Sequence, residues 1–273
     1  MKLQYLGTAA AEGVPGMFCE CPICQNARAV GGREVRTRSQ SIIDGQLLID
    51  FPADTYWHIT REGIRLQGIR HLLVTHAHSD HFYPKDFENR SPGYAQLPDG
   101  LPRLQLYGSK AVADAYFAVA HESWQVDVHV LEPFQAVDIG GYRVTPFPAN
   151  HDPAAGPFVY AIESDDARLF YCNDSGVPCN EAFAYIAAQG LHFDAISLDC
   201  TGILNTWRDG HMGLPANREV VDKLAEIGAI DADTVIIVNH FSHNGGLTYA
   251  QLVEKLAENS NWQVAYDGMT VEF

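Results

Sequence analysis

Long hydrophobic runs are absent from this 273-residue chain. Its longest apolar stretches, such as residues 234–238, are far too short to cross a lipid bilayer, which takes about 20 residues. Residues 1–6 lead directly into a strand pattern and do not resemble a secretion signal. We therefore expect a cytoplasmic protein that does not contact a membrane.

Basic residues are also scarce, because 18 Lys and Arg stand against 34 Asp and Glu, for a formal net charge of −16. Proteins that bind long nucleic acids normally carry a basic face. The charge balance therefore argues against long RNA or DNA as a partner. Bound divalent metal ions would still make a local site positive. Small or at most short anionic substrates therefore remain compatible with the negative net charge.

The chain lacks solenoid-scale repeats, coiled-coil heptads and low-complexity tracts. At 47% hydrophobic residues it can form one large domain or two small ones, with a sizeable core. In a reducing cytosol we expect no disulfides among its six cysteines. Three cysteines stand apart from the cluster described below, and we expect them to be small core residues: Cys172, Cys179 and Cys200.

Strand and helix patterns alternate through both halves of the chain. Turn signals indicate hairpins at Asp44-Gly45, Gly140-Gly141 and Asp267-Gly268. Further strands are expected at residues 3–8, 72–75, 104–107, 158–162, 168–172, 195–200 and 234–239. Helices are expected at residues 54–62, 110–121, 180–189 and 216–227, and from an N-cap at Thr248 to about Glu258.

Hairpins followed by helices in two successive halves predict an α/β fold. The expected architecture is an αββα sandwich, in which two mixed sheets pack face to face with helices on the outer faces. The one shift in composition is the Pro- and Gly-rich stretch 82–102. We predict that this stretch is a lid or insertion.

Three histidines and an aspartate crowd into six residues at the end of the apolar strand 71–75, in the run His76-Ala77-His78-Ser79-Asp80-His81. Imidazole and carboxylate are the ligands that suit zinc, manganese or iron. On an extended backbone His76 and His78 project to one side, because side chains alternate. Asp80 and His81 follow after the chain has turned and can serve a second ion. The spacing therefore predicts two metal half-sites.

Further ligands of the same kind end later strands: His151 follows 147–150, Asp174 follows 169–172 and His240 follows 235–239. Residues at the ends of adjacent strands converge on one edge of a sandwich. In this order the chain resembles the metallo-β-lactamase superfamily, which implies a single domain over residues 1–273. The resemblance implies one metal held by His76, His78 and His151, another held by Asp80, His81 and His240, and Asp174 bridging both.

The cysteine cluster Cys19-x-Cys21-x-x-Cys24 supplies three thiolates, and a closed structural zinc site needs a fourth ligand. His243, three residues after His240, can complete it if it turns away from the dinuclear centre. With Gly7-Thr8 and 13–15, this cluster resembles the PhnP-type branch, cyclic phosphodiesterases associated with phosphonate breakdown. That resemblance also implies a homodimer.

The same branch places an active-site histidine at the position of His211, where it contacts the phosphate and assists the leaving group. A histidine can donate that proton at neutral pH. The expected catalytic residues are thus His211, Asp80 and Asp174. Many superfamily members carry Gly-Leu a few residues after the metal motif, and this chain does not. The wall of its substrate site should therefore differ from theirs. Aromatic side chains there are substrate-contact candidates or, equally, hydrophobic anchors of the insertion: Phe82, Tyr83 and Tyr94.

The leading hypothesis is a metal-dependent phosphodiesterase for small phosphodiesters, cyclic ones included, with two Zn, Mn or Fe ions and one structural Zn. Three alternatives stay open. One is ribonuclease Z-like tRNA processing, although no basic arm is visible. Another is hydrolysis of an ester, thioester or lactone. The last is a non-catalytic metal-binding relative in cofactor biosynthesis, a group that also carries the Cys-x-Cys-x-x-Cys motif.

Overall fold

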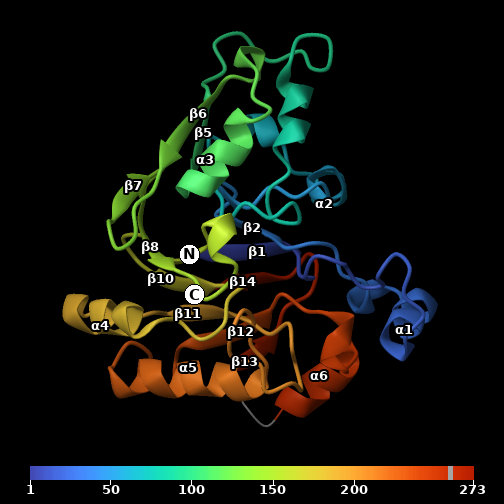
Figure 1. Ribbon diagram of the computed structural model, residues 1–273, viewed down its shortest axis with the longest axis vertical. Coiled ribbons are helices and arrows are strands. Elements are labelled where there is room, and N and C mark those ends of the chain that lie inside the picture. The colour runs from blue at the N-terminus through green and yellow to red at the C-terminus, as the bar shows by residue number, and fades with distance from the viewer. Residues whose placement is uncertain (258–260) are drawn as a thin grey trace.

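The computed structural model describes residues 1–257 and 261–273. Within them the strands form two mixed sheets of seven strands each (Figure 1). The first sheet has the order β14 (Thr270–Glu272), β1 (Lys2–Gly7), β2 (Gln40–Ile43), β3 (Leu47–Ile49), β4 (His71–Leu73), β5 (Leu104–Gly108) and β6 (Val126–Val130). The second has the order β13 (Trp262–Val264), β12 (Val235–Asn239), β11 (Ala195–Asp199), β10 (Arg168–Cys172), β9 (Phe158–Glu163), β8 (Tyr142–Pro148) and β7 (Val137–Ile139).

The two sheets pack face to face, and helices cover their outer faces, which confirms the αββα sandwich. The inner core joins residues of both sheets, such as Ile49 and Tyr160. The helices are α1 (Pro22–Val30), α2 (Thr55–Glu62), α3 (Lys110–Phe117), α4 (Asn180–Gln189), α5 (Leu214–Glu226) and α6 (Tyr249–Leu256). Helices α4 and α5 lie along the second sheet at the bottom of Figure 1, and α3 packs on the first sheet. None of the described helices is long and apolar enough to cross a membrane.

Local sequence signals predicted most helices and strands close to their observed positions. At the β2–β3 hairpin, Asp44 and Gly45 have φ of 50° and 68°, the left-handed values that a type I′ turn requires. Thr248 caps α6 with a complete capping box. This helix was expected to reach about Glu258. Its C-cap is Ala257, and Glu258 lies outside the described residues.

The hairpin predicted at Asp267-Gly268 is wrong. β13 pairs with β12 in the second sheet, whereas β14 pairs with β1 in the first, so the chain crosses from one sheet to the other at this turn. The Asp267 carboxylate accepts hydrogen bonds from the side chains of Thr8 and Thr37, which lie beside β1 and β2. These long-range bonds hold the crossing, and the local turn signal did not contain them.

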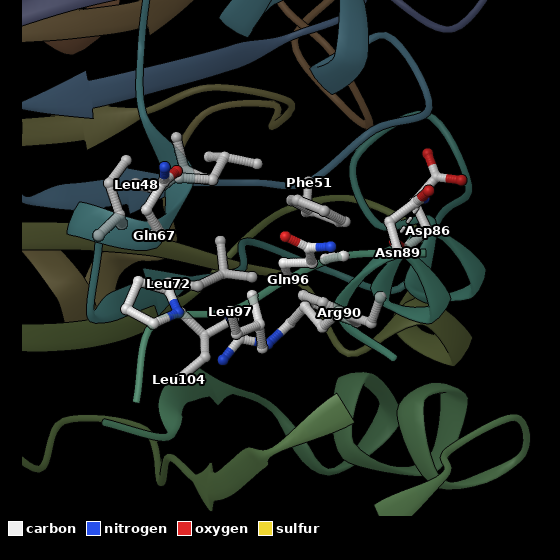
Figure 2. A pocket seen from close by; sticks show the side chains of 15 residues that line it. Leu48, Phe51, Gln67, Leu72, Asp86, Asn89, Arg90, Gln96, Leu97 and Leu104 are labelled. Atoms are coloured by element: carbon white, nitrogen blue, oxygen red, sulfur yellow. Dashed lines mark hydrogen bonds between the residues drawn. The ribbon is translucent and has the colours of Figure 1, made fainter. Parts of the chain in front are cut away.

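The segment 82–102 packs against the outer face of the first sheet. Its short helical stretch Pro84–Arg90 places the Phe87 ring flat on the Phe51 ring, with centroids 4.5 Å apart. Phe82 and Phe87 are both buried there. These two rings anchor the segment in the outer core, and other residues of the segment line a cavity of about 260 Å³ beside it (Figure 2).

Candidate metal centre and structural zinc site

The strand ends bring the seven expected metal ligands into two adjoining groups. One group comprises His76, His78, His151 and Asp174, and the other comprises Asp80, His81, Asp174 and His240. Within each group the ligand atoms all lie within 4.8 Å of one another. The ligands come from the loops after β4, β8, β10 and β12, so the convergence expected at one edge of the sandwich is present.

Three imidazoles and one carboxylate face one another in the first group. His78 Nδ1 lies 3.0 Å from His76 Nε2 and 3.2 Å from His151 Nε2. Asp174 Oδ2 lies 3.1 Å from His76 Nε2 and 3.6 Å from His151 Nε2. Four ligand atoms thus surround one point.

The second group shares the same carboxylate oxygen. Asp174 Oδ2 lies 3.2 Å from His81 Nε2 and 3.7 Å from His240 Nε2. His81 Nε2 also lies 3.1 Å from His240 Nε2 and 3.4 Å from Asp80 Oδ2. One oxygen of Asp174 therefore faces both groups, which is the arrangement that a bridging ligand needs.

These separations fit metal ions. Four ligand atoms at 2.0–2.1 Å from a tetrahedral zinc ion stand about 3.3 Å apart. The distances above scatter around that value. Burial also explains why the groups need a cation, because Asp80, Asp174, His76, His81 and His240 are all buried. The donor set, nitrogen and carboxylate oxygen, suits Zn, Mn or Fe.

The opposite nitrogen of each buried imidazole is occupied by a hydrogen-bond partner. His81 Nδ1 donates to Asp50 Oδ2 at 2.7 Å, and His151 Nδ1 donates to the Gly210 carbonyl at 3.0 Å. His240 Nδ1 lies 2.8 Å from Thr201 Oγ1. Such partners fix the ring orientation and tautomer of a metal ligand. They leave Nε2 of each ring facing the cluster.

Three aspartate and histidine residues at the centre have left-handed backbone conformations, with φ of 66° at Asp50, 52° at Asp174 and 59° at His240. A residue with a side chain pays for that conformation, and it persists where surrounding structure enforces it. Asp50 and His240 directly follow β3 and β12, and Asp174 comes two residues after the end of β10, so all three stand at the edge of the sandwich. Strain of this kind is concentrated at functional sites.

Asp50 was not found by sequence reasoning, although it gave the same signal as Asp174: a carboxylate directly after an apolar strand. It accepts hydrogen bonds from the backbone and hydroxyl of Thr75 as well as from His81. Asp199, at the end of β11, was missed for the same reason. It accepts from the Met212 backbone at 2.8 Å and lies 3.2 Å from His240 Nδ1. Both carboxylates position imidazoles of the cluster.

We expect Asp50→Asn to weaken metal binding by about 10–100-fold, the usual cost of losing a hydrogen-bond partner of a ligating histidine. Metal titration of the chelator-treated variant measures this. The control is Asp127→Asn on β6, which removes a carboxylate whose side-chain partners are Arg103 and Gln105 and none of the cluster residues. Equal metal affinity in the two variants would show that Asp50 does not position His81.

His211 joins the cluster from the loop before α5. Its Nδ1 lies 3.1 Å from Asp174 Oδ1 and 3.3 Å from Asp199 Oδ2. Partial burial alone would lower the pKa of His211, but the two carboxylates outweigh it and raise the pKa to about 10. Its side chain is 31% exposed. The ring thus borders both the cluster and solvent, as a group that meets substrate must.

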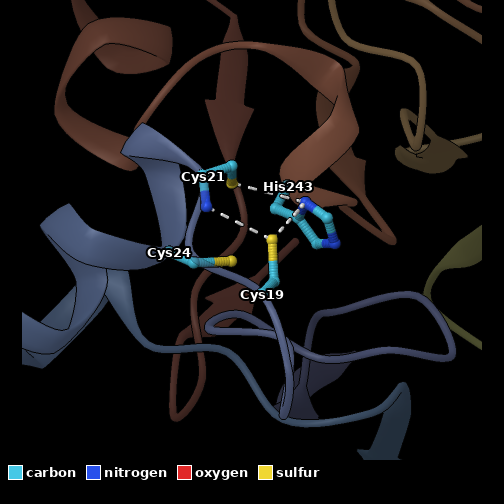
Figure 3. A group of neighbouring side chains, drawn as sticks. All are labelled: Cys19, Cys21, Cys24 and His243. Atoms are coloured by element: carbon cyan, nitrogen blue, oxygen red, sulfur yellow. Dashed lines mark hydrogen bonds between the residues drawn. The ribbon is translucent and has the colours of Figure 1, made fainter.

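The three clustered cysteines face His243, as Figure 3 shows. His243 Nδ1 lies 3.5 Å from Cys21 Sγ and 3.7 Å from Cys19 Sγ. A zinc ion with Zn–S of 2.3 Å and Zn–N of 2.0 Å separates such atoms by about 3.5 Å. His243 Nε2 points instead toward the Glu12 carboxylate, 3.7 Å away. The four donors therefore fit a closed zinc site.

Structural zinc contributes directly to folding free energy. We expect Cys21→Ser to lower the melting temperature by about 10 °C, because each kcal/mol lost shifts a protein of this size by roughly 2–4 °C. Differential scanning calorimetry measures it, and Cys179→Ser, a half-buried cysteine outside the cluster, is the control. An unchanged melting temperature with lost activity would reverse the expected roles of the two metal sites.

The three aromatic candidates for substrate contact differ in burial. Phe82 is 2% exposed and packs in the core with Phe87, so a substrate does not reach it without displacing the core. Tyr83 is half-buried, and Tyr94 is exposed. Among the other cysteines, Cys172 and Cys200 are buried as expected, whereas Cys179 is half-buried.

Comparisons with known proteins agree with this geometry. The family model of the Beta-lactamase superfamily domain matches residues 49–240, which include all seven ligands of the centre but not the cysteine cluster. Coenzyme PQQ synthesis protein B of Methylobacterium radiotolerans is 27% identical over 99% of both chains. Ribonuclease Z of a Mycobacterium species is 27% identical over 52% of this chain and 55% of its own.

Solved structures share the fold. A diphosphatase from the PhnP family has a TM-score of 0.75 and 23% identity, covering all of this chain and 96% of its own. Zinc-bound PqqB from Methylobacterium extorquens has a TM-score of 0.73 and 21% identity over the whole of both chains. The family model spans most of the chain and contains the whole histidine and aspartate cluster. This protein belongs to the family of the Beta-lactamase superfamily domain.

Proposed function

We propose that the protein is a dinuclear metal-dependent phosphohydrolase whose substrates are small phosphodiesters, cyclic ones included. The observation that carries the proposal is His211 beside a complete ligand set. The side chain of the shared Asp174 faces both metal groups and also lies within 3.1 Å of His211 Nδ1. His211 also belongs, with Asp174, Asp199 and His240, to a group of side chains that could hold a metal ion, and its partial exposure leaves the ring open to a substrate bound at the centre.

The chemistry that two bound divalent ions supply is activation of water near neutral pH and neutralisation of charge on a phosphoryl group. His76, His78 and His151 would hold one ion and Asp80, His81 and His240 the other, with Asp174 shared. The protein's own part is to orient these ligands through Asp50 and Asp199. His211, with Nδ1 held by two carboxylates, presents Nε2 to a leaving oxygen and donates a proton to it.

The substrate is small because of charge. The chain carries a net charge of −16, which disfavours binding of a long polyanion. The diphosphatase of the PhnP family supports the choice of phosphate chemistry, and it makes diphosphate esters the first compounds to compare. The resemblance of the cysteine cluster to that of the PhnP-type branch also supports phosphate chemistry. A homodimer, tested by light scattering, is part of the same proposal.

A second candidate is a role in cofactor synthesis, which the whole-length similarity to Coenzyme PQQ synthesis protein B favours. An activity screen separates the two. Metal-loaded protein would be tested on bis-p-nitrophenyl phosphate, a cyclic ribose phosphodiester, a diphosphate ester, a lactone, a thioester and a precursor tRNA. We expect turnover of the small phosphate esters. Turnover of the tRNA, lactone or thioester alone, or of none of them, would contradict the proposal.

A further inference from the structure

The loop that carries His211 runs from the end of β11 to the start of α5, over residues 200–213. Residues 204 and 206–209 of this loop are exposed. An exposed loop does not by itself hold a side chain in one place, because few packing contacts restrain it. The backbone around His211 therefore needs contacts of its own to stay beside the metal ligands.

Asn150, which directly precedes the metal ligand His151, contacts this loop with its whole side-chain amide. Its Nδ2 donates to Asp209 Oδ1 at 3.1 Å and to the Val177 carbonyl at 3.3 Å. Its Oδ1 accepts from the Gly210 backbone at 3.4 Å. Both N–H donors and the carbonyl acceptor of the amide are thus in use. A carboxylate of the same shape would instead set an oxygen against two other oxygens.

The backbone of Asn150 contacts the segment 173–177, which follows β10. Its N–H donates to Ser175 Oγ at 3.0 Å, and its carbonyl accepts from the Gly176 N–H at 2.8 Å. Asn150 therefore joins three segments: its own, the segment after β10, and the loop before α5. Each of these segments carries one residue of the candidate site: His151, Asp174 and His211.

Gly176 shows how closely the loop before α5 lies on the segment after β10. A Cβ atom at this position would clash with the Arg208 carbonyl oxygen and would stand 2.8 Å from both Asn150 Nδ2 and Asp209 Cα. Closely packed neighbours leave no room for even one methyl group there. A side chain at position 176 would therefore push the loop away from Asn150.

We propose that Asn150 is a positioning residue that holds the loop before α5 against the metal centre and so sets the place of His211. Because both N–H groups of its amide are bound within the protein, Asn150 acts on the loop and not on a substrate. The effect on catalysis rests on the proposed function of His211 as a general acid. The ordering of the loop does not depend on any substrate.

Hydrogen exchange followed by mass spectrometry tests this contact in the full-length, metal-loaded protein without a substrate. In Asn150→Asp, the amides of residues 207–213 should exchange at least about tenfold faster than in the wild type, the scale of one lost hydrogen bond. Gly176→Ala should have the same effect. The control is Asn89→Asp, because Asn89 Nδ2 donates to the Asp86 carbonyl in the segment 82–102. Unchanged exchange of residues 207–213 in Asn150→Asp would overturn the proposal.

Two further measurements separate positioning from a general loss of stability. Asp209→Asn introduced into Asn150→Asp should recover part of the slow exchange, because the new amide can donate to the new carboxylate. In steady-state kinetics, Asn150→Asp should lower kcat for a ribose phosphodiester by about tenfold and affect bis-p-nitrophenyl phosphate much less. The same substitution in His211→Ala should cause no further loss, because both changes act through one group.

The outcomes distinguish this proposal from the proposed function. A full further loss of kcat in the His211→Ala background, or loss of metal from Asn150→Asp, would show that Asn150 acts on the metal ligands and would overturn the proposal. Faster loop exchange in a protein that hydrolyses no phosphodiester would support the role of Asn150 while contradicting the proposed function.

Discussion

Asp174→Ala is expected to abolish hydrolysis, with a loss on the order of 10³-fold or more in kcat, because the two ions that this carboxylate would help to hold would contribute several kcal/mol of transition-state stabilisation. The same oxygen, Oδ2, lies within 3.7 Å of four imidazole nitrogens from both ligand groups. No other single side chain among the described residues belongs to both ligand groups. Metal content should fall with activity, and the ratio of bound metal to protein after dialysis measures it.

The fold should survive this change, because the aliphatic core lies between the sheets and does not depend on the carboxylate. Circular dichroism provides the check. Asp152→Ala is the matched control, since this exposed carboxylate contacts one expected ligand, His78 Nε2 at 3.3 Å, besides the Ala154 backbone amide at 3.0 Å. A much smaller loss is expected there. Wild-type activity in Asp174→Ala would rule out a bridged centre.

His211→Ala is expected to slow an alkyl or ribose phosphodiester by about 10²–10⁴-fold, the usual contribution of a general acid. An alkoxide is a poor leaving group and needs a proton as it departs. p-Nitrophenolate leaves as a stable anion, so bis-p-nitrophenyl phosphate should lose much less. Steady-state kinetics on both substrates, with metal content measured in parallel, gives the comparison.

The two substrates distinguish the roles open to His211. If the ring mainly binds the phosphate, both substrates should lose activity alike. Asp199→Asn is a useful companion, because it changes one of the two carboxylates on His211 Nδ1 while leaving Asp174 in place. It should reproduce part of the substrate-dependent loss. Unchanged turnover of both substrates in His211→Ala would remove this residue from the reaction.

The ligands could be predicted from the sequence because they lie in the segments that come just after apolar strands. Strand ends meet at one edge of a sandwich, so the order of His76, His151, Asp174 and His240 in the chain already implied their meeting in space. The partners of those ligands gave a weaker signal. Asp50 and Asp199 also end strands, but a carboxylate at a strand end without a nearby motif has many ordinary explanations.

What the sequence could not supply were contacts between distant segments. The turn at Asp267-Gly268 carries a strong local hairpin signal, yet bonds to Thr8 and Thr37 direct the chain into the other sheet. Phe82 stands next to a metal ligand in sequence, but its ring turns into the core beside Phe87. Strand β6 and helix α1 were also missed. Val126–Val130 alternates only partly, and α1 begins at Pro22 within the cysteine cluster.

The number of metal ions per chain tests the account most directly. Inductively coupled plasma mass spectrometry on protein purified without chelator should find three: two in the centre and one zinc at the cysteines. Cys21→Ser should lose the single zinc and keep two ions, whereas Asp174→Ala should keep that zinc and lose metal from the centre. Protein without zinc whose Cys19, Cys21 and Cys24 react freely with thiol reagents, or with at most one ion in all, would contradict the account.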